Sequence, residues 1–232
     1  MPQPPVILMA FSNDREGKFL RNISEEHQKL KTTISPLAEK GLVQLIDLPN
    51  ASLDDIFQTF KRYKDRVAIF HYGGHAHDME LLFSQQQNPV DMAYFAKYLA
   101  QQKGLRLVFF NACTTLPQLH VLQEAGISHL ILTDTAINDE AAKLFSESFY
   151  QHMASGRTVS RSFQEAAAEV ETKVGGSTRG LIWEGQHISL DPSLPWKHIA
   201  SSHPDWALPT QKPFPLRATL ISLFILLLSV LA

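Results

Sequence analysis

The stretch Leu105–Thr115, LRLVFFNACTT, decides the fold. Its apolar part is typical of a strand buried on both faces of a parallel sheet, and it delivers Cys113 at its carboxyl end. An earlier stretch, Val67–Asp78, has the same construction: the apolar residues VAIF lead into HYGGHAHD, a run of small and polar residues that contains His75. Because the carboxyl ends of neighbouring parallel strands meet at one edge of a sheet, we expect the cysteine and the histidine cluster to lie together.

Short apolar runs alternate with amphipathic segments on both sides of these stretches, which is typical of βα repeats. The pattern therefore predicts an α/β fold with a mainly parallel sheet flanked by helices. The strands are expected at Val6–Phe11, Leu42–Ile46, Val67–His71, Leu105–Phe110 and His129–Thr133, with a short edge or hairpin element at Glu80–Phe83. The helices are expected at Leu20–Leu37 before a stop at Gly41, after an N-cap at Ser52, and at about Val90–Gln101, Asn138–Ala154 and Thr158–Thr172.

The regular alternation fades after Gly175 and Gly176. We assign residues 1–175 to the main domain, 176–203 to a loop-rich extension and 204–217 to a proline-rich, semi-rigid linker. Residues 218–232 form a last segment that is apolar on every side and carries no charge.

The 15 residues of that last segment fall short of the about 20 that cross a bilayer core. They predict a truncated transmembrane segment or a short tail anchor, and a buried C-terminal helix is the alternative. Lys212 and Arg217 precede the segment, so the positive-inside rule places the domain in the cytoplasm, tethered to the membrane by a single pass. The N-terminus lacks the features of a secretory signal peptide.

Composition excludes several classes of function. The 232 residues carry a formal net charge of -2, which argues against a nucleic-acid partner. The 44% of hydrophobic and 19% of charged residues are ordinary for a globular protein. A single cysteine, Cys113, excludes an internal disulfide framework and a zinc site with several cysteines.

The cysteine and the histidine cluster together supply the two groups that thiol catalysis requires, a nucleophile and a base. An imidazole close to Cys113 favours its thiolate, and a helix beginning just after the cysteine would lower the thiol pKa further. The small residues around both groups let a substrate carbonyl approach the backbone. Backbone N–H groups beside His75 and at Cys113 would then stabilise a tetrahedral oxyanion.

Each candidate also has a structural interpretation. His71 is expected to pack within its strand, and His77 is the rival of His75 as the base. Zinc binding by His71, His75 and His77 is disfavoured, because an extended chain would have to fold sharply to bring them together. Thr114 and Thr115 are expected to cap the helix that follows Cys113.

Two acidic residues are candidates for a substrate pocket. Asp78 and Asp139 lie near the expected crevice, where a carboxylate would select a basic side chain at P1, the substrate residue before the cleaved bond. A solvated turn or a helix start is the alternative for both, and we favour it for Asp139. The sequence has no Gly-rich phosphate loop after its first strand, which argues against a nucleotide-binding domain.

Three blocks of the sequence resemble the CHAT domain of the caspase-like, separase-like clan of cysteine peptidases. They are HYGGHA at residues 71–76, VFFNACTT at 108–115 and SHLILTDTAINDEAAKLFSESFY at 128–150, and the similarity spans about Pro5 to Thr172. The resemblance implies that His75 is the general base or acid and Cys113 the nucleophile. It also makes Gly74 and the amides of Ala76 and Cys113 candidates for the oxyanion hole.

The sequence departs from the commoner family pattern at two positions. Ala76 replaces a glycine after the histidine, and Asn111 and Ala112 stand where Asn-Gly is more frequent before the cysteine. A backbone donor survives at Ala76, and we place Asn111 near the site.

The resemblance implies a cysteine endopeptidase that uses neither metal nor organic cofactor and acts on a protein or peptide substrate. Regulated proteolysis or signalling, including bacterial defence or cell death, is the expected setting, with a homodimer or a fused sensor or effector domain as partner. The alternative is a catalytically inactive CHAT-type docking module tethered to the membrane.

Overall fold

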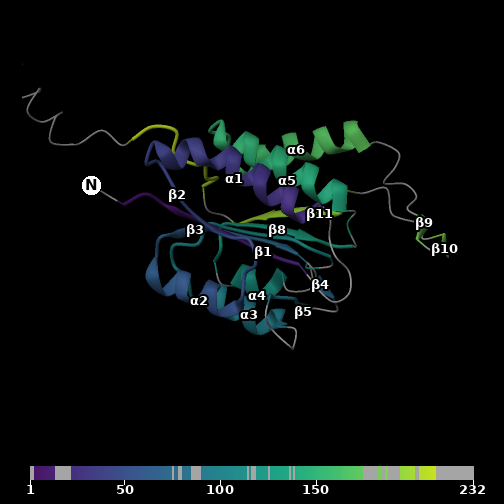
Figure 1. Ribbon diagram of the computed structural model, residues 1–232, viewed down its shortest axis with the longest axis horizontal. Helices are drawn as coiled ribbons and strands as arrows, with labels where there is room; N and C mark the ends of the chain where they lie inside the picture. Colours follow the sequence, from purple (N-terminus) through teal and green to yellow (C-terminus); the bar gives the residue numbers. More distant parts are fainter. Residues whose placement is uncertain are drawn as a thin grey trace, which may run out of the picture.

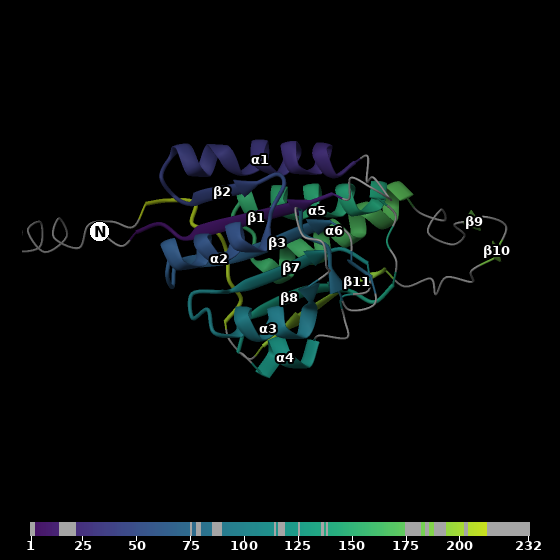
Figure 2. The ribbon, with the colours of Figure 1, turned by 60° about the horizontal axis from the view of Figure 1, so that its bottom comes forward.

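A computed structural model describes residues 3–13, 22–74, 76–77, 80–84, 90–113, 115, 119–124, 126–135, 137, 139–174, 182–183, 186–187, 194–201 and 204–212. Its main feature is a six-stranded sheet in the order β11-β8-β7-β3-β1-β2, with helices on both faces (Figures 1 and 2). Helices α1, α5 and α6 cover one face, and α2, α3 and α4 cover the other. The predicted α/β architecture is therefore confirmed.

Five of the six sheet strands follow the predicted apolar runs closely, and the sixth, β11, was not predicted. Neighbours pair in parallel throughout the sheet except at one edge, where β11 runs antiparallel to β8. The strands of this sheet are β1 Val6–Ser12, β2 Gln44–Leu48, β3 Val67–Gly74, β7 Leu107–Asn111, β8 His129–Thr133 and β11 Trp196–Ala200.

Smaller sheets complete the strand inventory of the described residues. The expected element near Glu80 belongs to a three-stranded antiparallel sheet that follows β3 in the chain, with the strands β4 Ala76–His77, β5 Glu80–Leu81 and β6 Val90–Asp91. A separate two-stranded sheet pairs β9 Ile182–Trp183 with β10 Gln186–His187.

The helices begin and end where local chemistry directs. They are α1 Ile23–Glu39, α2 Leu53–Arg62, α3 Met92–Ala100, α4 Leu119–Glu124, α5 Asp139–Ala154 and α6 Val159–Val174. Ser52 caps α2 as predicted, since its hydroxyl accepts from the Asp55 backbone N–H while the Asp55 carboxylate accepts from the Ser52 N–H. Gly41, with φ of 67°, provides the left-handed turn that ends the first helical segment.

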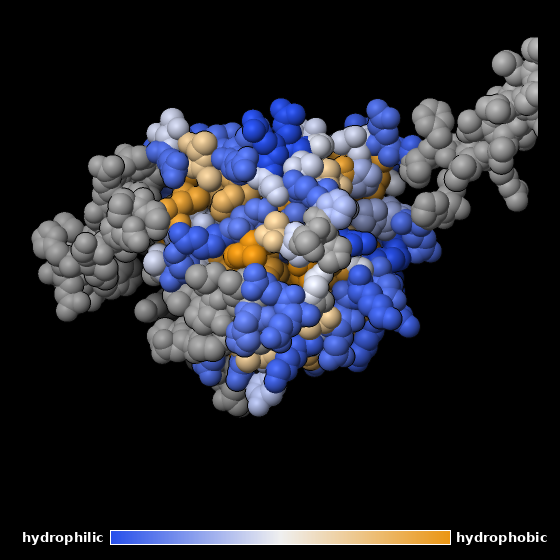
Figure 3. Space-filling model, turned by 180° about the vertical axis from the view of Figure 1, so that it is seen from behind, coloured by the Kyte–Doolittle hydropathy of each residue, from blue (hydrophilic) through white to orange (hydrophobic). Residues whose placement is uncertain are grey.

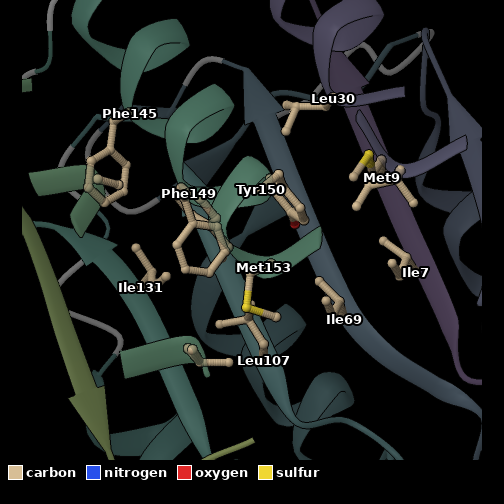
Figure 4. Close-up of a cluster of buried hydrophobic side chains, with 14 of the residues drawn as sticks. Ile7, Met9, Leu30, Ile69, Leu107, Ile131, Phe145, Phe149, Tyr150 and Met153 are labelled. Carbon is tan, nitrogen blue, oxygen red and sulfur yellow. The ribbon is translucent and has the colours of Figure 1, made fainter. Parts of the chain in front are cut away.

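The hydrophobic core lies in two layers, one on each face of the sheet. Figure 4 shows the layer beneath α5, whose aromatic side chains Phe145, Phe149 and Tyr150 point onto the strands. They meet Ile69, Leu107 and Ile131, which are all fully buried. Seen from the side opposite to Figure 1, apolar surface gathers in a band between the polar outer surfaces of the two helical layers (Figure 3).

The segment after α6 differs most from the sequence prediction. Trp196 was expected in a loop-rich extension, but it begins β11, and its ring is buried and stacked on Phe145 at a centroid distance of 4.3 Å. Residues 204–212 were expected to be part of a spacer, yet Leu208 is buried in the core and the carbonyl of Trp206 accepts from the Val159 N–H. The proline spacing gave no indication that this chain docks on the domain.

Candidate active site

The two polar clusters meet at one edge of the sheet, as the sequence predicts. β3 and β7 are neighbours, and Gly73 of β3 is in register with Asn111 of β7. Gly74 therefore ends one strand beside Ala112 and Cys113, which follow the other. A shallow pocket opens here, lined by Ile23, Glu26, Gly74, Asn111, Ala112, Cys113, Ile137, Asp139 and Ala142. Cys113 is half-buried and has a free thiol.

Three predicted residues, His75, Asp78 and Thr114, lie outside the described residues. Ala76 is half-buried in β4, where it pairs with Leu81. Of the predicted dyad, Cys113 lines the pocket, and so does Gly74, the residue before His75 in the chain.

Gly74 has no room for a side chain. A Cβ at this position would lie 2.6 Å from the Ser12 carbonyl oxygen and 2.7 Å from the Tyr72 hydroxyl. The strand end beside the pocket is therefore packed closely enough to require glycine.

His71 is fully buried within β3, so the expectation that it packs inside the strand is confirmed. Its ring lies among the rings of Phe11, Phe109 and Tyr150. Its Nε2 atom is 3.5 Å from the Glu26 carboxylate, beyond normal hydrogen-bond range. Within the part of the chain that the structure describes, no cluster of His, Cys, Asp or Glu is suited to a metal ion.

Asn111 connects the site to three other elements. Its amide nitrogen donates to Glu26 Oε1 at 2.8 Å and to the Ala142 carbonyl at 3.1 Å, while its oxygen accepts from the indole N–H of Trp196 at 3.0 Å. Both amide hydrogens are thus engaged with α1 and α5, and the oxygen is engaged with β11. The side chain of Asn111 fixes the strand end two residues before Cys113.

Glu26 is a pocket residue that the sequence reasoning missed. It lies between Ile23 and Leu30 on the buried face of α1, and the structure leaves it only 4% exposed. A carboxylate on the apolar face of an amphipathic helix was the available signal. Glu26 also affects Tyr150. Burial raises the pKa of the Tyr150 phenol, and the negative charge of Glu26 raises that pKa further.

Asp139 begins α5, as its favoured interpretation predicted, and it also lines the pocket; a role in selecting a substrate side chain stays a prediction. One carboxylate oxygen accepts from the Asn22 backbone N–H at 3.0 Å and ties the start of α1 to the start of α5. Together, Asp139 and Glu26 give the pocket beside Cys113 two carboxylates.

Thr115 was expected to cap a helix, but it bonds to the neighbouring strand instead. Its backbone N–H donates to the Thr133 carbonyl at 2.9 Å, and its hydroxyl accepts from the Thr133 N–H at 2.9 Å. The hydroxyl of Thr133 in turn donates to the Ala112 carbonyl. All these groups are buried, so the chain on either side of Cys113 is fixed to the end of β8.

Comparison with known protein families matches residues 3–207 to the CHAT domain. The chain belongs to the CHAT domain family. No curated protein matches the chain. Among solved structures, a secreted C11 cysteine protease from Bacteroides thetaiotaomicron, in complex with an irreversible peptide inhibitor, is similar at 12% identity and a TM-score of 0.55. The match covers 78% of this chain and 62% of the protease, so this CHAT domain spans less than two thirds of that protein.

The protease match shows that the CHAT domain has a caspase-like fold, with a mostly parallel sheet between helical layers. Pyridoxal kinase from Staphylococcus aureus in complex with pyridoxal also matches, at 12% identity over 87% of this chain and 100% of the kinase. Its TM-score is only 0.39.

The described part of the CHAT chain contains no helix that is both long and apolar enough to cross a membrane. The apolar segment 218–232, for which the sequence predicts a membrane role, lies outside that part.

Proposed function

We propose that this CHAT domain is a cysteine endopeptidase that cleaves a protein partner, with Cys113 as nucleophile and His75 as general base and acid. The observation that supports it most is the half-buried thiol at the end of β7, which shares a pocket with Gly74, the residue directly before His75. Nucleophile and base from adjacent strand ends are the arrangement that thiol catalysis needs.

The proposed reaction has two halves. His75 takes the proton of Cys113, and the thiolate attacks the scissile carbonyl, whose electron pair moves to oxygen and forms a tetrahedral oxyanion. The Cys113 amide and the backbone beside His75 stabilise that oxyanion. As it collapses, the C–N bond breaks and the imidazolium of His75 gives its proton to the leaving amine. Water, activated by His75, then hydrolyses the thioester and restores the thiol.

The charge of the pocket supports a preference for basic P1 side chains. Glu26 and Asp139 both line it, and no Lys or Arg is among the described residues of its wall. An unpaired cation entering such a pocket gains from both carboxylates. This proposal adds Glu26 to Asp139 and Asp78, the pocket acids predicted from the sequence.

The test is cleavage of a peptide library by the full chain. Wild type is expected to cleave after Arg or Lys, and Cys113→Ala and His75→Ala are expected to reduce the rate to background. His77→Ala is the matched control, because it removes the rival imidazole two residues away and is expected to retain activity. Undiminished cleavage by Cys113→Ala would eliminate the proposed nucleophile. Absence of cleavage by wild type, with a Cys113 unreactive toward peptidyl ketones, would favour the docking module.

We also propose that the peptidase acts in regulated proteolysis or signalling, including bacterial defence or cell death. We propose further that residues 218–232 tether the domain to a membrane from the cytoplasmic side. The uncharged sequence of this segment and the preceding Lys212 and Arg217 support that placement.

A further inference from the structure

Thr133 holds the chain on both sides of Cys113. It is the last residue of β8 and is fully buried. Its hydroxyl donates to the carbonyl of Ala112, the residue before the cysteine. Its backbone N–H and carbonyl bond to the hydroxyl and N–H of Thr115, each at 2.9 Å. A single residue of the neighbouring strand thus anchors positions 112 and 115.

The bond to Ala112 determines where the Cys113 amide points. The Ala112 carbonyl and the Cys113 N–H belong to one planar trans peptide unit, so they point in opposite directions. β7 lies between β8 and β3 in the sheet. With its carbonyl held toward Thr133 of β8, this peptide directs the Cys113 N–H toward the β3 side, where Gly74, the last residue of β3, also lines the pocket.

This direction is the one that an oxyanion hole requires. A donor stabilises a developing oxyanion best when it is already oriented and needs no rearrangement during the reaction. A hydrogen bond to the carbonyl also polarises the N–H of the same peptide unit. Rotating the peptide away would break the bond to Thr133 and leave the buried Ala112 carbonyl without it.

We propose that Thr133 is a positioning residue for catalysis. Its hydroxyl holds the Ala112 carbonyl and so orients the Cys113 N–H toward the oxyanion of the substrate. This inference rests on the proposed peptidase function. Thr133 then helps to stabilise the transition state and does not contribute to binding the substrate before the reaction.

The test compares Thr133→Val, which keeps the shape and removes the hydroxyl, with Thr133→Ser, which keeps the hydroxyl. Removal of a whole oxyanion donor costs about 100- to 1,000-fold in kcat, so a misdirected donor is expected to cost roughly 10- to 100-fold. The valine variant should show this loss in kcat with KM within about twofold of wild type, and the serine variant should recover most of it. If the valine variant does not fold, Thr133→Ala replaces it, because it removes the same hydroxyl without setting a methyl group against the Ala112 carbonyl.

Two thiol reagents separate positioning from a general loss of structure. A peptide aldehyde adds to Cys113 and forms an oxyanion-like hemithioacetal, whereas iodoacetamide alkylates the same thiol by displacement of iodide and forms no oxyanion. Thr133→Val should weaken aldehyde binding about tenfold or more and leave the alkylation rate within about twofold. Thr115→Val is the control, since it disturbs the same anchor but leaves the Thr133 bond to Ala112 in place, and it should keep the wild-type ratio of the two reactions.

Equal kcat in wild type and Thr133→Val would overturn the inference while leaving the peptidase proposal intact. Parallel losses toward aldehyde and iodoacetamide would also overturn it, because the nucleophile itself would then be displaced. A wild-type protein that neither cleaves peptides nor binds the aldehyde would overturn both proposals together.

Discussion

The indole of Trp196 should stabilise the candidate active site from the edge of the sheet. Its N–H donates to Asn111 Oδ1 at 3.0 Å, and its ring, which is 2% exposed, stacks on Phe145. Trp196→Phe preserves an aromatic ring at this position but removes the donor. The substitution therefore leaves a buried amide oxygen unpaired, two residues before Cys113.

The expected cost has two parts. An unsatisfied buried acceptor costs about 1–3 kcal/mol. The smaller ring gives up roughly another 1 kcal/mol of apolar burial. We therefore expect Trp196→Phe to lower the free energy of unfolding by about 2–4 kcal/mol. For a chain of this size, that corresponds to a fall in Tm of roughly 5–12 °C.

Urea unfolding followed by far-UV circular dichroism measures the change without relying on tryptophan fluorescence. A double-mutant cycle with Asn111→Ala measures the coupling of the two side chains, because in that background Trp196→Phe breaks no bond to Asn111 and instead removes a buried indole N–H that has already lost its acceptor. A coupling free energy of about 1–2 kcal/mol is expected. If Trp196→Phe lowers the free energy of unfolding equally in both backgrounds, the hydrogen bond from the indole does not stabilise the strand that leads to Cys113.

Two further predictions concern pH and the C-terminal segment. His198 of β11 stacks on His129 of β8 beside Asp205, and burial, followed by the charge of His129, lowers the pKa of His198 to about 4. Because the unfolded chain takes up this proton near pH 6.5 and the folded chain does not, stability should fall from pH 6.5 to pH 4, by about 2 kcal/mol for this partly exposed group. His198→Phe should flatten that decline in urea titrations at each pH, and an unchanged slope would show that another group causes it. Deleting residues 218–232 should move the expressed protein from the membrane pellet to the supernatant, and an equal distribution of both forms would contradict the proposed tether.

The sequence predicted the strands and helices well up to Val174 because their hydrophobic periodicity is strong. His129–Thr133 is a run of buried residues bounded by polar ones, and its predicted limits match β8. The meeting of Gly74 and Cys113 at one sheet edge also followed from the parallel order of the strands. These features depend on local pattern and on a general property of parallel sheets.

The contacts between distant residues could not be predicted in this way. β11 has five residues, among them Lys197 and His198, and only its pairing with β8 makes it a strand. Glu26 reaches the pocket from α1 and accepts a hydrogen bond from Asn111, 85 residues later in the chain. No local motif marks Thr133 either, and only the hydrogen bond from its hydroxyl to the Ala112 carbonyl connects it to the site.

The most direct test of the central claim is mass-spectrometric mapping of a peptidyl acyloxymethyl ketone with Arg at P1 after reaction with the full-length protein. A single covalent adduct is expected on Cys113, formed by wild type and by His77→Ala and strongly slowed in His75→Ala. Free Arg-containing peptide is expected to protect Cys113 from the reagent. A Cys113 that stays unmodified, or one that reacts equally fast in His75→Ala, would contradict the assignment of this pocket as a cysteine peptidase site.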